Sequence, residues 1–125
     1  MSSRPLLRPQ KVIVNGDMSS SVTSLVTNIN MISCVGYTVA WTGTPTGTFS
    51  VEVSQDYVAP VGVQDEPLNA GTWVPLTLSV PVAAAGTADT AFIDIDVTGA
   101  AYVRLVYTAA SGSGTLNATI AGKVI

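Results

Sequence analysis

The stretch TFSVEVS, residues 48–54, alternates apolar and polar side chains without a break. Successive side chains of a β-strand point to opposite faces of a sheet, so this pattern predicts a strand with one buried face. Phe49, Val51 and Val53 would face the core. The polar positions would face outward: Ser50, Glu52 and Ser54. The stretch therefore indicates a sheet that packs on one side against a hydrophobic core.

Strand patterns of the same kind recur on both sides of this stretch, and no segment keeps helical periodicity over the length of a helix. They cover residues 11–14, 21–29, 31–42, 72–78, 92–97, 102–108 and 115–125. Tyr37, Val39 and Trp41 share one face of their strand, and Pro75 indicates a strand at a sheet edge or with a bulge. About eight strands at near-regular spacing predict one all-β domain over residues 12–125. We expect an antiparallel β-sandwich, either jelly-roll or immunoglobulin-like.

The segments between these strands carry turn signals. NGD at residues 15–17 predicts a turn, and the loops at 43–47 and 111–114 predict hairpins. Residues 82–90 are small and predict a crossover between two sheets. Residues 55–71 form a loop longer than most, and loops of that length are usually functional or mobile.

Composition favours a protein that packs into an assembly. Of the 125 residues, 47% are hydrophobic and only 10% are charged, and the mean hydropathy is +0.45. A typical soluble domain carries about 25% charged residues. No stretch is long and apolar enough for a membrane span, so we expect no membrane partner. A surface with so few charges suits broad contacts with neighbouring proteins.

Basic residues gather near the N-terminus. Arg4, Arg8 and Lys11 are three of the five basic residues. The rest of the chain contains only two basic residues but all eight acidic ones. Pro5 and Pro9 disfavour a helix, so residues 1–11 are expected to form an extended basic arm or a loose terminus. As an arm, it would contact a partner protein through Arg4, Leu6, Leu7, Arg8 and Lys11. We expect no nucleic-acid binding, because the rest of the chain is acidic and has no basic patch.

The sequence offers no catalytic constellation. It contains no histidine, the usual general base and metal ligand, and its single cysteine, Cys34, is expected to be buried and inert. Asp94 and Asp96 share one strand face near Asp89, which allows a surface calcium site or simply a solvated face. The sequence therefore predicts a protein that is not an enzyme and that holds no cofactor or metal.

Three aromatic residues raise the question of a binding platform. Trp41 continues a buried face and is expected in the core. Tyr57 lies in the long loop and Trp73 follows Gly71, so both are expected to be exposed. They would serve as contacts for a partner protein, as aromatic residues often do. If they lay together on a flat face, they would instead suit a sugar.

Three stretches carry a family resemblance: GTFSVEVSQDY (47–57), NAGTWVPLTLS (69–79) and the closing segment AAYVRLVYTAASGSGTLNATIAGKVI (100–125). Together they resemble small β-sandwich structural proteins of tailed bacteriophages. The resemblance covers the chain from about Gly47 onward and does not include the N-terminal third.

This resemblance implies a virion protein, made in the host cytoplasm, without enzymatic activity. The preferred assignment is a capsid decoration (cement) protein on the capsid exterior, a homotrimer that bridges subunits of the major capsid protein. Two alternatives remain: a tail, baseplate or fibre-associated virion protein, and a carbohydrate-binding module on the virion surface.

Overall fold

The computed structural model describes residues 6–30, 32, 34–62, 66–78, 80–95 and 99–123, with the side chain of Leu6 left out. This part of the chain contains ten strands and no helix, which confirms the predicted all-β sandwich. The strands are β1 (Leu6–Asp17), β2 (Val22–Thr23), β3 (Thr27–Asn28), β4 (Cys34–Gly43), β5 (Thr46–Ser54), β6 (Val74–Pro75), β7 (Ala83–Ala85), β8 (Asp89–Ile95), β9 (Tyr102–Ser111) and β10 (Gly114–Lys123).

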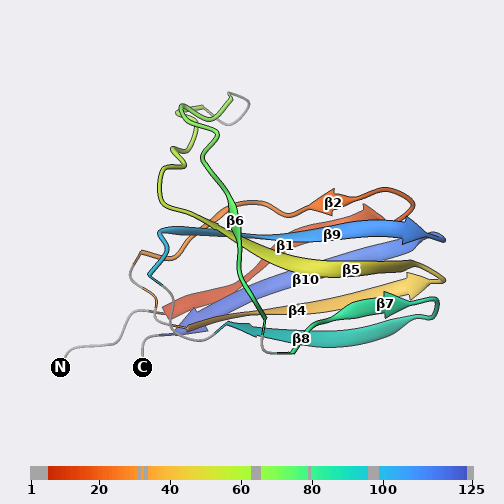
Figure 1. Ribbon diagram of the computed structural model, residues 1–125. Coiled ribbons are helices and arrows are strands. Elements are labelled where there is room, and N and C mark those ends of the chain that lie inside the picture. Colours follow the sequence, from red (N-terminus) through yellow and green to blue (C-terminus); the bar gives the residue numbers. More distant parts are fainter. Residues whose placement is uncertain are drawn as a thin grey trace.

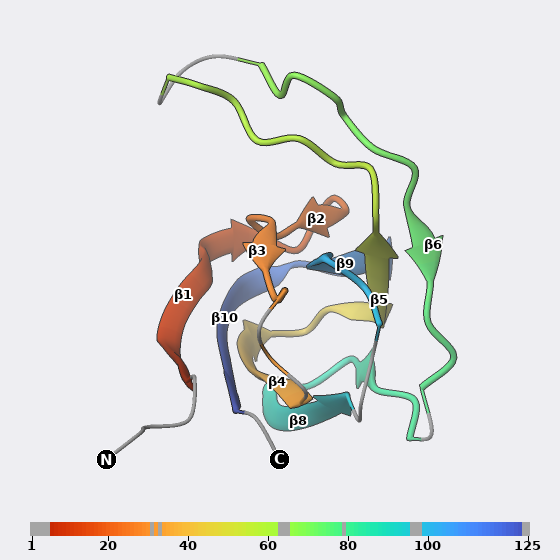
Figure 2. The same ribbon diagram turned by 90° about the vertical axis from the view of Figure 1, so that its left-hand side faces the viewer.

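The strands form two antiparallel sheets that pack face to face (Figures 1 and 2). One sheet has the order β1-β10-β4-β8. The other has the order β2-β9-β5-β6, in which β3 also pairs with β9 and β7 also pairs with β5. Since β2 and β3 share one edge and β6 and β7 the other, the ten strands fill eight positions, close to the predicted number.

The pairing pattern identifies the topology as a jelly roll. Along the chain, β1 pairs with β10, β2 and β3 pair with β9, β4 pairs with β8, and β5 pairs with β6 and β7. These pairs are nested, as in one long antiparallel hairpin that has been rolled up into two sheets. Of the two topologies left open by the sequence, this is the jelly roll.

The core lies between the sheets and follows the alternation seen in the sequence. Phe49 and Val51 are buried, as are Tyr37, Val39 and Trp41 on β4. The inward positions of the partner strands complete it: Ile93, Ile95, Val103, Leu105, Tyr107, Leu116, Ala118 and Ile120. Ser54 is an exception, because it was expected to face outward and is only 2% exposed.

Two predicted hairpins are wrong. The loops at 43–47 and 111–114 do not join paired strands, because β4 and β10 lie in one sheet whereas β5 and β9 lie in the other. Both loops therefore cross from sheet to sheet, and they contact each other: the Thr44 amide donates to the Ser113 carbonyl at 2.9 Å. Gly43 has a φ of 84°, and a Cβ there would lie 2.6 Å from that same carbonyl oxygen. The crossover expected within residues 82–90 is confirmed, since β7 and β8 belong to different sheets.

The turn predicted at residues 15–17 is a β-bulge instead. β1 continues to Asp17, and its pairing with β10 shifts register between Ile13 and Gly16. Asn15 takes up the irregularity with a φ of 52°, a left-handed conformation that asparagine tolerates better than most residues.

The boundary expected between residues 11 and 12 falls inside β1. Leu6 pairs with Lys123, and Lys11 pairs with Thr119, so residues 6–11 are hydrogen-bonded into the sheet. They are extended, as expected from the two prolines, but they belong to the sandwich. Residues 1–5, including Arg4, lie outside the described residues, so an arm remains a proposal for them alone.

Two other segments form less regular strand than predicted. Residues 21–29 contribute β2 and β3, two short strands rather than one. Residues 72–78 contribute only β6, which lies at the sheet edge where Pro75 was expected. A proline lacks the N–H needed to pair on both sides, which explains this placement.

Candidate functional site

The loop between β5 and β6 is the most prominent feature outside the two sheets. It extends well beyond the sandwich in both views (Figures 1 and 2). Near its base the amides of Val58 and Asn69 each donate to the carbonyl of the other, at 3.0 and 3.4 Å. The loop thus doubles back on itself as an irregular hairpin, and residues 63–65 within it are not described.

Asp56 fastens the base of this loop. Its Oδ1 accepts hydrogen bonds from the Thr72 amide at 2.7 Å and from the Ser54 hydroxyl at 2.9 Å, and its Oδ2 accepts one from the Thr72 hydroxyl at 3.1 Å. The Thr72 amide and then the Ser54 hydroxyl lower the pKa of Asp56 below its usual value of 3.8. We call Ser54, Asp56 and Thr72 the carboxylate clasp. It joins the two ends of the loop across 16 residues of sequence.

The buried position of Ser54 follows from this clasp. The Ser54 hydroxyl also accepts a hydrogen bond from the Tyr57 amide at 3.2 Å. A buried hydroxyl needs such partners, and the clasp supplies them. Gly71 completes the turn next to Thr72 with a φ of 85°, and a Cβ there would lie 2.9 Å from the Ser54 Oγ.

Aromatic side chains pack beside the clasp. Tyr57 lies 5.8 Å from Trp73 and 5.1 Å from Tyr102, measured between ring centroids. The Trp73 indole N–H donates to the Ala70 carbonyl at 2.9 Å. Tyr57 and Trp73 were expected to be exposed; both are half-buried. The structure brings these two predicted partner contacts together, where they brace the loop base.

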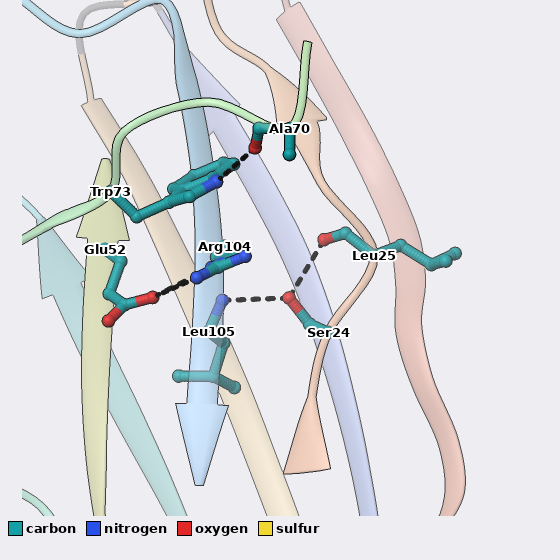
Figure 3. A network of polar contacts seen from close by, with 7 residues as sticks. All are labelled: Ser24, Leu25, Glu52, Ala70, Trp73, Arg104 and Leu105. Carbon is teal, nitrogen blue, oxygen red and sulfur yellow. Dashed lines mark hydrogen bonds and ion pairs between the residues drawn. The ribbon is translucent and has the colours of Figure 1, made fainter. Parts of the chain in front are cut away.

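An ion pair extends this cluster across the sheet. Arg104 on β9 contacts Glu52 on β5, with 2.7 Å between Nη2 and Oε1, and its guanidinium lies 4.2 Å from the centre of the Trp73 ring (Figure 3). Glu52 and Arg104 are direct partners in the β5–β9 register. Sequence reasoning missed Arg104, Glu52 and Tyr102, because only the jelly-roll pairing makes β5 and β9 neighbours.

The arrangement does not favour a sugar platform. The planes of Tyr57 and Trp73 are tilted by 58° to each other, and Arg104 lies over the Trp73 ring. A flat stacking surface would require both rings open and close to coplanar. Trp41, the third aromatic considered, is buried as predicted, and its indole N–H donates to the Thr87 carbonyl at 2.8 Å.

The predicted partner residues near the N-terminus differ in their surroundings. Arg8 and Lys11 are exposed on β1, whereas Leu7 is partly buried against the core. Leu7 therefore contributes to packing within the sandwich. The side chains of Arg4 and Leu6 lie outside the described residues.

The residues considered as a reactive thiol or as metal ligands do not form a cluster in the described part of the chain. Cys34, expected to be buried, is half-buried at the first residue of β4. Asp89 and Asp94 are exposed on β8, and Asp96 is not described. Among the described residues, no group of three or more histidine, cysteine or acidic side chains is placed to hold a metal ion. The described residues also contain no helix that could span a membrane.

Comparisons with known proteins bear on the fold. No family model matches this chain, and no curated protein matches it. Among solved structures, it is similar to a chain in the structure of infectious bursal disease virus, Gx strain, with a TM-score of 0.55 and 7% sequence identity. The match covers 98% of this chain but only 32% of the viral one. At this identity the likeness shows a shared fold: essentially the whole chain corresponds to one part of a longer chain from a virus.

Proposed function

We propose that this chain is a non-enzymatic structural protein of a virus particle, and specifically a capsid decoration protein of a tailed bacteriophage. The observation that carries the proposal is the jelly roll, which is similar over nearly the whole chain to part of a chain from a virus structure. Jelly rolls are common in viral capsids, although they also occur in lectins and cupins. The resemblance of residues 47–125 to phage structural proteins supports the narrower assignment.

The surface chemistry supports a role in broad protein contacts. On the outer face of the four-stranded sheet, neither residues 36–42 of β4 nor residues 114–122 of β10 include a charged side chain. Threonine, alanine and asparagine dominate there, and the neighbouring edge strand β8 adds Phe92, which is 61% exposed, beside the exposed Asp94. Such a surface can be covered by another protein with little cost of desolvating charges.

A decoration protein stabilises a capsid by binding the assembled lattice. Binding that favours the expanded lattice over its precursor shifts the population towards the expanded form. In this proposal the chain sits on the capsid exterior, bridges subunits of the major capsid protein, and self-associates as a trimer. Its synthesis takes place in the host cytoplasm, and residues 1–5, with Arg4, act as a short basic arm.

The test is the number of copies of this chain in purified virions, measured by quantitative mass spectrometry against the major capsid subunit. A decoration protein is present in numbers set by the symmetry of the capsid lattice, and we expect that result. A few copies per particle would place the chain in a tail, baseplate or fibre, which overturns decoration but keeps a virion role. Absence from virions would overturn both.

A further inference from the structure

The tip of the β5–β6 loop exposes apolar side chains beside a negative charge. We define the loop tip as Val61, Glu66 and Leu68, which lie in the sequence between the paired residues Val58 and Asn69. Val61 is 85% exposed and Leu68 is 68% exposed, and Glu66 is also exposed. The loop extends away from both sheets (Figure 2), and none of these residues belongs to the hydrophobic core or packs against it. Apolar side chains this exposed, on a segment that covers no part of the core, are candidates for a contact with another protein.

A second surface of the same chain has the complementary character. We define the β1 corner as Arg8, Lys11, Val14 and Leu25. Val14 is 61% exposed and Leu25 is 68% exposed, and both basic residues are exposed. The Leu25 amide donates to the Val12 carbonyl at 3.1 Å, which holds the segment between β2 and β3 along β1. The corner thus combines apolar side chains with positive charge.

Hydrogen bonds hold the base of the loop and the segment that carries Leu25. The carboxylate clasp and Trp73 brace the loop. In the corner, the buried Ser24 hydroxyl donates to the Leu25 carbonyl at 2.9 Å and accepts from the Leu105 amide at 2.8 Å (Figure 3). A surface whose backbone is already ordered loses less entropy on binding, which favours association.

We propose that the loop tip of one copy docks on the β1 corner of a second copy of this chain. The charge distribution supports this choice of partner. Glu66 is the charged residue of the loop tip, and its neighbour in the sequence, Asp65, is also acidic, whereas the charged residues of the β1 corner, Arg8 and Lys11, are both basic. Opposite charges orient the two surfaces, and apolar contacts between Leu68, Val61, Leu25 and Val14 supply affinity.

This contact joins two different surfaces, so it is heterologous. Repeated around a rotation axis, a heterologous contact closes into a ring, which includes the trimer proposed above. The inference rests on that proposed self-association and identifies the surfaces that produce it.

The apolar half of the contact is tested with Leu68→Lys and Leu25→Asp, in which the new charge has the same sign as the surface it faces; each is measured by light scattering and sedimentation over a range of protein concentrations. Each variant places a charge in the proposed contact, and we expect the dissociation constant to rise at least about tenfold. Val80→Asp is the matched control, because Val80 is 73% exposed but lies in neither surface. Its association should equal that of the unmodified chain. Thermal unfolding of all three checks that the sandwich is intact.

The charged half is tested by a charge swap. Glu66→Lys alone and Arg8→Glu with Lys11→Glu should each weaken association, because each places like charges opposite one another. The chain that carries all three substitutions should regain much of the loss, since the charges are again complementary. Association that improves in this way requires the two surfaces to meet.

Three results would overturn the proposal. The unmodified chain could be monomeric at every concentration, Leu68→Lys and Leu25→Asp could associate as well as Val80→Asp, or the chain with all three charge substitutions could associate no better than the chains with fewer. None of these results affects how the copy number in virions is interpreted. The decoration proposal therefore stands or falls on its own measurement.

Discussion

The sandwich and the β5–β6 loop obtain their order by different means. In the sandwich, Leu105 and Ile120 are fully buried between the sheets, and the backbone is paired along long strands. In the loop, Val61 is 85% exposed, and order at the base comes from the carboxylate clasp and the packing of Tyr57 on Trp73. The comparison indicates that the global stability of the fold and the order of the loop depend on different contacts, so that substitutions can alter one without the other.

The largest change in the free energy of unfolding is expected for a substitution in the core. Leu105 is fully buried at the middle of β9, so Leu105→Ala should leave a cavity and lower the free energy of unfolding by about 3 kcal/mol. Leu68→Ala in the loop removes the same atoms from a side chain that is 68% exposed and should leave that free energy nearly unchanged. Urea denaturation of both variants measures the difference. Equal losses would show that the loop is part of the core's cooperative unit.

A smaller change in the free energy of unfolding, an increase rather than a decrease, is expected for a substitution at Tyr107. Its side chain is fully buried, and its hydroxyl has no hydrogen-bond partner among the described residues. Tyr107→Phe removes this unpaired group and keeps the ring, which lies 5.0 Å from that of Phe49. We expect the free energy of unfolding to rise by about 1 kcal/mol. A fall would reveal a hydrogen bond to the Tyr107 hydroxyl that the described residues do not account for.

The smallest effect on global stability is expected at Asp56. A carboxylate whose pKa is lowered by folding stabilises the fold above its unfolded pKa, near 3.8, and this contribution is lost as the pH falls through the folded value. Acidification below pH 3.8 should therefore open the loop base, seen as a change in Trp73 fluorescence. Trp41 is buried and provides the internal reference in a Trp73→Phe control.

Asp56→Asn should remove that acid transition and speed hydrogen exchange at the Thr72 amide, while core amides exchange as before. If the core amides accelerate as well, the loop base and the sandwich open together. The separation between the two regions would then be wrong.

Sequence pattern was sufficient for features that depend on neighbouring residues. The alternation around Phe49 and Val51, and around Ile93 and Ile95, predicts strands whose faces the structure confirms. The predictions that were wrong concern which strands pair with each other. Residues 43–47 and 111–114 do reverse the chain, but a turn signal does not say which sheet the next strand will join.

The candidate site shows the same division. Tyr57 and Trp73 were identified from their types and positions alone, but their half-burial depends on Arg104 and Tyr102, which lie some thirty or more residues further along the chain. The partner of Arg104, Glu52, is 52 residues away in sequence. Such contacts follow from the nested strand order, which local periodicity does not contain.

The nesting also has a consequence for how the protein is made. β10 lies between β1 and β4, so β1 cannot join β4 and β8 in the four-stranded sheet until residues 114–123 have left the ribosome. Until then β1 lacks its principal partner and the apolar side chains meant for the core stay accessible to chaperones and proteases. Pairings this distant in sequence also place folding among the slower two-state processes, on the order of milliseconds to seconds. A product cut short before β10 lacks the strand that joins β1 to β4, so it cannot form the complete four-stranded sheet.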